Sequence, residues 1–241
     1  MSARSGGPRS SPLPTEAATG FKERLRRLAH LAVEPLTATL VRLGVGPDGV
    51  TVMGLLVSLI AALAFFEGYF QLGALMVATA GVCDILDGEL ARRSGRHSRF
   101  GAFLDSTLDR LSDGMVLAGI AGFYLVHLTE LAMDPSQAVA EITRGLEPRT
   151  WAVVSLTAVL AMLGSFMVSY TRARAEGLGL ECRVGWFERP ERMVLIIVAG
   201  AFGVGPVMSG ALIALAALSF ATAGQRVAYI WKHTRGAGHD D

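Results

Sequence analysis

Apolar residues follow one another in long blocks along most of this chain, and short polar or glycine-rich connections separate the blocks. A helix of about 20 apolar residues spans a bilayer, so each block after residue 45 is expected to be a membrane-spanning helix. The six expected spans are residues 50–66, 70–92, 100–128, 151–173, 192–202 and 205–231. The fifth block is short, and because Gly200, Gly203 and Gly205 follow its apolar run, the pattern does not fix its boundary with the sixth. The pattern predicts an all-α, polytopic membrane protein.

A basic amphipathic segment precedes these spans. Residues 21–44 carry apolar side chains at helical spacing and have four basic residues grouped near their start. Such a helix suits the surface of an anionic membrane, although a helix packed on the domain would show the same pattern. Pro35 predicts a kink or break near Glu34. Residues 1–20 are rich in Ser, Pro and Gly and lack the apolar core of a signal peptide, so we expect a disordered tail, native or in part added for expression.

Composition agrees with the membrane interpretation. The 241 residues are 51% hydrophobic and only 18% charged, whereas soluble domains carry about 25% charged residues. The formal net charge of +1 gives no support to nucleic-acid binding. Only two cysteines are present, Cys83 in an apolar block and Cys182 in a basic connection, so a disulfide framework is not expected.

The connections between the expected spans alternate in charge. The N-terminal segment, residues 93–99, residues 174–189 and the C-terminus are basic, whereas the opposite connections have no basic residue or balance theirs with acids. Since cytoplasmic loops are enriched in Lys and Arg, this alternation predicts an even number of spans in the cytoplasmic membrane with both termini in the cytoplasm. The predicted organisation is a tail (1–20), a juxtamembrane helix (21–44), a six-helix domain (45–232) and a cytoplasmic tail (233–241).

Two pairs of aspartates lie inside consecutive apolar blocks. Asp84 and Asp87 are three residues apart, and Asp105 and Asp109 are four apart, so each pair shares one helix face. The two helices are antiparallel and joined by a short basic loop. Asp84 lies eight residues before Arg92, or about 12 Å along its helix, and Asp109 lies nine residues after Phe100, or about 13 Å. The pairs are therefore at a similar depth and can converge on the cytoplasmic side.

Four carboxylates at this depth need a counter-charge. One ionised side chain at the bilayer centre costs about 2.5–3.5 kcal/mol, and the four also repel one another. Arg110 is the one basic residue that the sequence places at that depth in these stretches. Hard divalent cations such as Mg²⁺ prefer carboxylate oxygens, so a metal site is the favoured interpretation. The ion pathway of a transporter is the alternative, because transporters also use intramembrane acids.

Small residues and one arginine accompany the aspartates. Gly88, Ala91 and Gly101 would let a ligand or a neighbouring helix approach the backbone closely. Arg92 follows Ala91 and can meet a phosphate. The acids could bind metal, the small residues leave room for a ligand, and the arginine could bind phosphate. Together they suggest a substrate whose pyrophosphate is bridged by metal.

The same residues carry a specific resemblance to a known family. The matching residues are Asp84, Asp87, Gly88, Ala91, Arg92, Gly101, Asp105 and Asp109. Their spacing is that of the pattern D-x2-D-G-x2-A-R-x8-G-x3-D-x3-D of CDP-alcohol phosphotransferases, with no departure. The rest of the chain also resembles that family, which has a juxtamembrane helix followed by six spans.

The resemblance implies a reaction in which an alcohol displaces CMP from a CDP-linked lipid. Asp84, Asp87 and Asp105 would hold one or two Mg²⁺ or Mn²⁺ ions. Asp109 would lie near the metal, as a further ligand, and serve as the general base for the acceptor hydroxyl. The expected CDP-binding residues are Gly88, Ala91 and Arg92, with Asp48 and Thr51 of the PDGVT stretch. The resemblance also implies a homodimer.

A second basic region indicates the acceptor. The arginines after Ser169 are explained in part by anchoring at the cytoplasmic face, and alternatively they form an anion pocket. The segment resembles phosphatidylinositol phosphate synthases, in which SY-x-[KR]-ARAE and ER-x2-R stretches line the inositol phosphate site. The acceptor-phosphate residues implied are Ser169, Arg172, Arg174, Arg189 and Arg192.

The expected reaction is therefore transfer of a phosphatidyl group from CDP-diacylglycerol to inositol 3-phosphate. Within the same chemistry, glycerol 3-phosphate or free inositol is the alternative acceptor. An ion-coupled membrane transporter is the alternative from another functional class.

Overall fold

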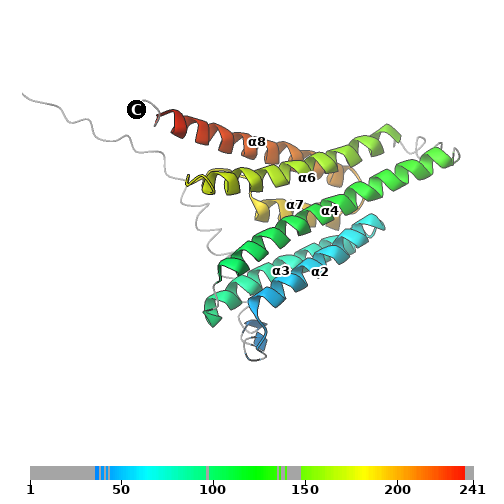
Figure 1. The fold of residues 1–241 in the computed structure, drawn as a ribbon. Helices are drawn as coiled ribbons and strands as arrows, with labels where there is room; N and C mark the ends of the chain where they lie inside the picture. The colour runs from blue at the N-terminus through cyan, green and yellow to red at the C-terminus, as the bar shows by residue number, and fades with distance from the viewer. Residues whose placement is uncertain are drawn as a thin grey trace, which may run out of the picture.

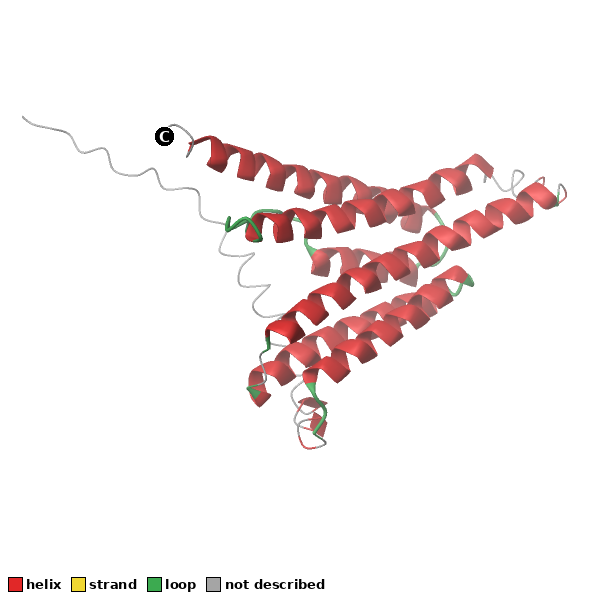
Figure 2. Cartoon of the chain, viewed as in Figure 1, coloured by secondary structure: helices red, strands yellow, loops and turns green. Residues whose placement is uncertain are grey.

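The computed structural model describes residues 36, 37, 39, 40, 42, 44–95, 98–134, 136, 139 and 148–236. Its helices, in chain order, are α2 (Pro47–Phe66), α3 (Phe70–Ser94), α4 (Arg99–Met133), α6 (Pro148–Glu176), α7 (Arg189–Ala201) and α8 (Pro206–Gly236). No strand occurs in these described ranges, as Figure 2 shows. The prediction of an all-α protein is confirmed for this part of the chain.

Successive helices run in alternating directions and form two groups. Helices α2, α3 and α4 lie together, α6 packs against α8, and the contact between α4 and α6 joins the groups (Figure 1). The short helix α7 packs between them, against α3 and α8. The C-terminal ends of α3, α6 and α8 therefore lie at the same end of the molecule as the N-terminal ends of α4 and α7 (Figure 1).

Five of the described helices, namely α2, α3, α4, α6 and α8, are long and apolar enough to cross a membrane. Helix α7 has only 13 residues, which is about 20 Å of helix against a hydrocarbon core of about 30 Å. The prediction of a polytopic membrane protein is thus supported, while the sixth span remains a prediction.

The helix boundaries follow the apolar blocks closely, and the larger differences are extensions beyond the blocks. Between the fifth and sixth blocks each boundary instead moves inward by one residue, since α7 ends at Ala201 and α8 begins at Pro206. Helix α4 continues to Met133 and α8 to Gly236, beyond the expected ends at residues 128 and 231. Hydropathy marks the part of a helix that faces lipid, whereas backbone hydrogen bonds carry the helix on into the polar interface. Residues 233–236, which the sequence assigned to a tail, accordingly extend α8.

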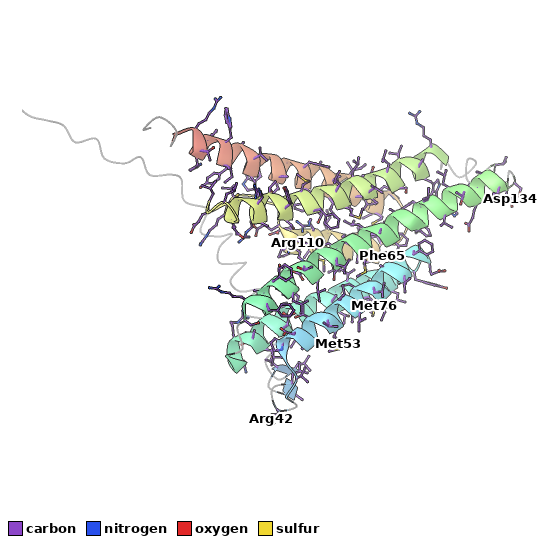
Figure 3. The ribbon with its side chains drawn as sticks, in the orientation of Figure 1. Arg42, Met53, Phe65, Met76, Arg110 and Asp134 are labelled. Atoms are coloured by element: carbon purple, nitrogen blue, oxygen red, sulfur yellow. The ribbon has the colours of Figure 1, made fainter. Side chains whose placement is uncertain are left out.

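The central helix α4 runs the length of the molecule. Figure 3 shows Arg110 toward one end of α4 and Asp134 beyond the other. Where α4 crosses α2, a side chain at Gly119 would place its Cβ 2.2 Å from the Ala62 carbonyl oxygen. Only glycine allows this approach of two backbones, which is the packing expected between helices in lipid.

A cluster of aromatic side chains closes the end of the molecule where α2 turns into α3. We call Phe65, Phe70, Phe123, Tyr124 and Trp151 the aromatic cluster; all but Phe123 are buried. The ring centroids of Phe65 and Phe70 are 5.3 Å apart, and those of Phe70 and Phe123 are 5.0 Å apart. Both pairs meet edge to face, a favoured geometry for aromatic rings. The cluster joins α2, α3, α4 and α6.

Little of the expected N-terminal segment falls in the described residues. Residues 36, 37, 39, 40 and 42 are helical, as expected for the end of the juxtamembrane helix. The tail at residues 1–20, the start of that helix and the kink at Pro35 lie outside the described residues.

Candidate metal and anion site

Three of the four expected aspartates come together between α3 and α4. Asp84, Asp105 and Asp109 each offer a carboxylate oxygen, and these oxygens all lie within 4.8 Å of one another. We call these residues the acid triad. Asp87 lies beside the triad, and it lines one cavity with Asp105 and a small pocket with Asp84 and Asp109. The two helix faces therefore meet at the depth that their spacing predicted.

The triad has the donor chemistry of a divalent metal site. Asp105 Oδ1 is buried and has no hydrogen-bond partner among the described residues. Burying a carboxylate oxygen without a hydrogen-bond donor costs free energy. A hard cation such as Mg²⁺ or Mn²⁺ removes this cost, because it prefers oxygen ligands and the triad offers carboxylate oxygens. The residues present therefore fit such an ion.

An arginine from a distant part of the sequence also reaches the triad. Arg189 Nη1 lies 3.0 Å from Asp84 Oδ2 and 3.0 Å from Asp109 Oδ2. Within the stretches that carry the acids the sequence offers only Arg110 at this depth, and Arg189 is a second cation that comes from outside them. The reason is tertiary: α7 begins at Arg189, and packing against α3 brings its first residue next to acids of α3 and α4.

The start of α7 is defined by local sequence. Glu188 is the N-cap, and it forms a capping box with Glu191, whose side chain accepts from the Glu188 backbone N–H at 3.1 Å. Pro190 occupies the first turn, where its missing N–H costs nothing. These residues fix the helix start, and so the place from which Arg189 and Arg192 project.

Asp113 is a fifth carboxylate that sequence reasoning missed. It is 7% exposed, and it accepts from Arg189 Nε at 3.3 Å and from Arg192 Nη2 at 3.0 Å. The signal was available, because Asp113 follows Asp109 by four residues and continues the face of Asp105 and Asp109 along one helix.

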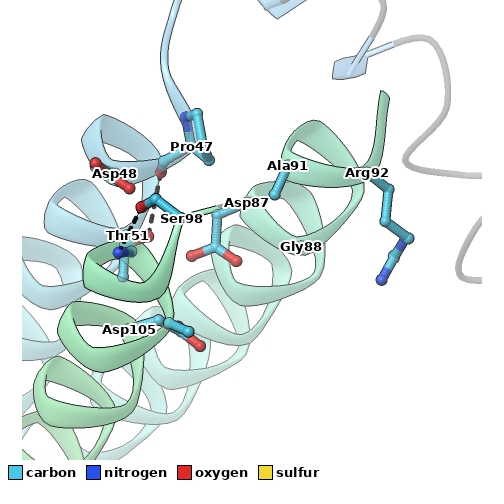
Figure 4. Close-up of a pocket in the computed structure, with 11 residues that line it drawn as sticks. Pro47, Asp48, Thr51, Asp87, Gly88, Ala91, Arg92, Ser98 and Asp105 are labelled. Atoms are coloured by element: carbon cyan, nitrogen blue, oxygen red, sulfur yellow. Dashed lines mark hydrogen bonds between the residues drawn. The ribbon is translucent and has the colours of Figure 1, made fainter. Parts of the chain in front are cut away.

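A cavity of about 210 Å³ opens on one side of the triad. We call it the nucleotide-side cavity, after the residues expected there. All five expected CDP-binding residues line it, together with Asp87 and Asp105. These five are Asp48, Thr51, Gly88, Ala91 and Arg92. Figure 4 shows Asp87 and Asp105 on facing helices, with Asp48 and Thr51 on the neighbouring α2.

Glycine shapes the mouth of this cavity. A Cβ at Gly101 would lie 3.2 Å from Asp48 Oδ1 and 3.0 Å from Ser98 Oγ, so a larger residue would crowd the start of α2 against the start of α4. Ser98 caps α4 by accepting from the Gly101 backbone N–H at 2.8 Å. Arg92 pairs with Glu89 at 2.9 Å, and 51% of its side chain is exposed, so a ligand can reach it.

A second cavity, of about 230 Å³, opens on the other side of the triad. We call it the arginine cavity. Asp105 and Asp109 line it, and so do four of the five expected acceptor residues. These four are Ser169, Arg172, Arg189 and Arg192. The fifth, Arg174, is exposed at the end of α6 and does not line this cavity. A step of two residues turns a helix by about 200°, which directs Arg174 away from the side of Arg172.

Arg192 is the most deeply buried of these expected arginines. It is 4% exposed, and its Nε and Nη1 have no hydrogen-bond partner among the described residues. A buried guanidinium with unpaired N–H groups beside a cavity is suited to bind an anion.

Arg226 also lines the arginine cavity, and sequence reasoning missed it. Its side chain is 2% exposed and pairs with Glu188 Oε1 at 3.2 Å. It also donates to the carbonyls of Val184 at 2.8 Å and Val168 at 2.5 Å. A single arginine inside the last apolar block was the available signal, because intramembrane charges are rare. Arg226 ties α8 to the connection that precedes α7.

The family model described as CDP-alcohol phosphatidyltransferase matches residues 45–223. The chain belongs to the CDP-alcohol phosphatidyltransferase family. It is therefore a multi-pass membrane enzyme, a transferase of phospholipid synthesis from a metal-binding family. The transporter alternative does not agree with this membership.

Curated relatives share most of the chain. It is 38% identical to an archaetidylinositol phosphate synthase of Methanothermobacter thermautotrophicus over 197 residues, which cover 80% of this chain and 87% of that protein. It is 35% identical to a phosphatidylinositol phosphate synthase of Mycobacteroides abscessus over 200 residues, covering 80% of each chain.

Solved structures of the Mycobacterium tuberculosis phosphatidylinositol phosphate synthase are also similar. The structure with CDP-DAG bound has a TM-score of 0.68 at 31% identity, covering 82% of this chain and 92% of that chain. The structure in complex with manganese and citrate has a TM-score of 0.67 at 32% identity, covering 82% of this chain and 88% of that chain.

Proposed function

We propose that this protein transfers a phosphatidyl group from CDP-diacylglycerol to 1D-myo-inositol 3-phosphate, releasing CMP and forming phosphatidylinositol phosphate. The observation that carries the proposal is the arginine cavity beside Asp105 and Asp109. An acceptor that already bears a phosphate needs paired N–H donors, and guanidinium groups supply them in a rigid fork. The relatives are named archaetidylinositol phosphate synthase and phosphatidylinositol phosphate synthase, and these names support the same acceptor.

The two cavities suggest how the substrates are arranged. Asp105 lines both of them, so a phosphorus atom near Asp105 is accessible from either side. The nucleotide of the donor lies in the nucleotide-side cavity, where Gly88 and Ala91 leave room and Arg92 can donate to its phosphates. The acceptor lies in the arginine cavity, with its phosphate toward Arg172, Arg189 and Arg192. The relative solved with CDP-DAG bound supports a lipid nucleotide as donor.

The four aspartates Asp84, Asp87, Asp105 and Asp109 would hold one or two Mg²⁺ or Mn²⁺ ions, which stabilise the charge that develops on the attacking and leaving oxygens. The fit rests on the acid triad and on the unpaired Asp105 Oδ1. The structure of a relative in complex with manganese supports this assignment.

Asp109 is the proposed general base. It belongs to the triad and also lines the arginine cavity, so it can reach the acceptor hydroxyl. Asp109 takes the hydroxyl proton, and the oxygen attacks the β-phosphorus of the donor. The bond from that phosphorus to the bridging oxygen breaks, and the oxygen leaves with CMP. The alkyl chains of the donor remain in the membrane throughout.

The proposed topology has six spans and cytoplasmic termini, with the juxtamembrane helix at residues 21–44 on the cytoplasmic surface. The path of the chain around α7 supports it. Helix α6 ends beside the arginine cavity, and the C-terminal part of α8 returns to it through Arg226. Only residues 202–205 link α7 to α8, so α7 must carry the chain toward the opposite end.

An acceptor panel tests the function. Purified protein in detergent is given CDP-diacylglycerol and Mn²⁺, and CMP release is measured with inositol 3-phosphate, inositol, glycerol 3-phosphate or serine. We expect inositol 3-phosphate to support release at least about tenfold faster than inositol or serine, which lack the phosphate, since one hydrogen bond to a charged group contributes about 1.5–3 kcal/mol. The names of the relatives lead us to expect faster release than with glycerol 3-phosphate as well. Chelation with EDTA should stop release, and added Mn²⁺ should restore it.

Each other outcome has a defined meaning. Faster release with glycerol 3-phosphate or inositol would replace the proposed acceptor with one of these alternatives. No acceptor-dependent release from any of the four would contradict the proposed reaction itself.

A further inference from the structure

Asp113 is a buried carboxylate that the proposed reaction does not use. It lies one helical turn beyond Asp109 on α4 and is 7% exposed. Taking a carboxylate out of water costs several kcal/mol unless charged or hydrogen-bonding groups compensate. The partners of Asp113 therefore indicate what it does.

The two carboxylate oxygens of Asp113 are divided between two arginines of α7. Oδ1 accepts from Arg189 Nε at 3.3 Å, and Oδ2 accepts from Arg192 Nη2 at 3.0 Å. Oδ2 also accepts a hydrogen bond from the hydroxyl of Ser165 of α6, at 3.4 Å. One side chain of α4 thus holds two guanidinium groups of α7 and is itself held from α6.

This arrangement determines which edges of the guanidinium groups remain available. A guanidinium is a planar, rigid fork, so fixing one edge fixes the direction of the others. With Nε on Asp113, Arg189 directs Nη1 to Asp84 and Asp109, at 3.0 Å from each. With Nη2 on Asp113, Arg192 keeps Nε and Nη1 without a partner among the described residues, although the residue is almost fully buried.

We propose that Asp113 is a positioning residue for the acceptor site. It orients Arg189 and Arg192 so that their remaining N–H groups face the acceptor phosphate. Both of its oxygens are engaged by donors, so Asp113 acts through the arginines rather than on the acceptor. The inference rests on the proposed function, because it requires an acceptor that bears a phosphate.

The variant Asp113→Asn tests this role. Asparagine has the same size but replaces one acceptor oxygen with an N–H₂ group, which faces a guanidinium donor and releases it. We expect the KM for inositol 3-phosphate to rise about tenfold or more, as for the loss of a hydrogen bond to a charged group. The KM for CDP-diacylglycerol should change by less than about twofold, because Asp113 does not line the nucleotide-side cavity.

Two further variants serve as controls. Glu130→Gln removes a carboxylate from the far end of α4, where Glu130 Oε2 lies 3.4 Å from His127 Nδ1, and should leave both KM values unchanged. Asp113→Glu keeps the charge but displaces it by one methylene group, so it should raise the acceptor KM less than Asp113→Asn does. Thermal unfolding identifies a variant that does not fold. If Asp113→Asn does not fold, Asp113→Glu tests the proposal: its KM for inositol 3-phosphate should rise more than its KM for CDP-diacylglycerol.

The outcomes separate the two proposals. If the wild-type protein is active and the Asp113 variants keep the wild-type KM for the acceptor, the role of Asp113 is overturned while the proposed function stands. An equal rise in the KM values for acceptor and donor would overturn that role as well. A wild-type protein that releases no CMP with inositol 3-phosphate would contradict the proposed function, and the role of Asp113 would fall with it.

Discussion

The aromatic cluster is mostly buried, whereas the acid triad is half-buried, and the two regions lie toward opposite ends of the same helices. The first is built from rings of α2, α3, α4 and α6, such as Phe70 and Trp151. The second is built from ion pairs among α3, α4 and α7, such as Arg189 with Asp84 and Asp109. Burial of rings stabilises mainly through the hydrophobic effect, which has no direction, whereas an arginine–carboxylate pair depends on the direction of a rigid fork.

This difference suggests a division of labour along α4. Apolar packing at one end holds the helices together, while directional charges at the other end set the positions of reacting groups. Substitutions in the aromatic cluster should therefore change stability more than specificity. Substitutions around the triad should change catalysis and acceptor binding more than stability.

The largest expected effect is that of Asp109→Asn. The amide cannot take a proton from the acceptor, so CMP release should fall at least about 100-fold, as for the loss of a general base. The measurement is CMP release at saturating acceptor and donor. The melting temperature should stay close to that of the wild type, which shows that the fold is intact. Activity within tenfold of the wild type would remove Asp109 from its role as base.

Phe70→Ala should have the next largest effect, on stability alone. Phe70 is fully buried and contacts Phe65 and Phe123, and truncating a buried phenylalanine costs about 3–5 kcal/mol. Thermal unfolding in detergent measures the loss. Below its melting temperature the variant should keep the wild-type KM for both substrates. A changed acceptor KM with unchanged stability would refute the division of labour.

Arg172→Ala should have a moderate effect on acceptor binding. Arg172 lines the arginine cavity but is 46% exposed and already paired with Glu176 at 3.0 Å. Partly solvated pairs contribute less than buried ones, so we expect the KM for inositol 3-phosphate to rise about fivefold. Steady-state kinetics with CDP-diacylglycerol in excess measures this. A rise as large as that of Asp113→Asn would mean that exposure does not weaken this contact.

Arg174→Ala should have the smallest effect, below about twofold in either KM, because an exposed charge on the opposite helix face contributes little. It is the matched control for Arg172→Ala, since both remove an arginine from the last turns of α6. Steady-state kinetics measured side by side compares the two variants. An equal rise in the acceptor KM for both variants would mean that Arg174 belongs to the acceptor site, as the sequence resemblance implied, although it does not line the arginine cavity.

The pattern of apolar blocks was sufficient to locate the helices, because each span must satisfy its backbone hydrogen bonds internally wherever its neighbours lie. The convergence of Asp84 with Asp105 and Asp109 was predictable for a related reason. Two antiparallel helices joined by a short loop place residues at equal distances from that loop at equal depth. Helix propensity and spacing alone lead to this result.

The partners of these acids were not predictable in the same way. Arg189 was expected at the acceptor site, but its approach to Asp84 and Asp109 depends on how α7 packs against α3. Asp113 and Arg226 were missed because their roles come from contacts with residues far along the chain, such as Asp113 with Arg192 and Arg226 with Val168. Spacing within one helix carries no information about such contacts.

The sequence by itself thus determined the helices, the depth of the acids and the family to which the chain belongs, since periodicity and motif spacing are local properties. Only the tertiary structure decided which arginines face the acids, which of the expected residues line each cavity and that Arg174 lines neither. The physical reason is that a charge in a membrane is stabilised by whichever partner packing brings within about 3 Å, and packing depends on the whole chain.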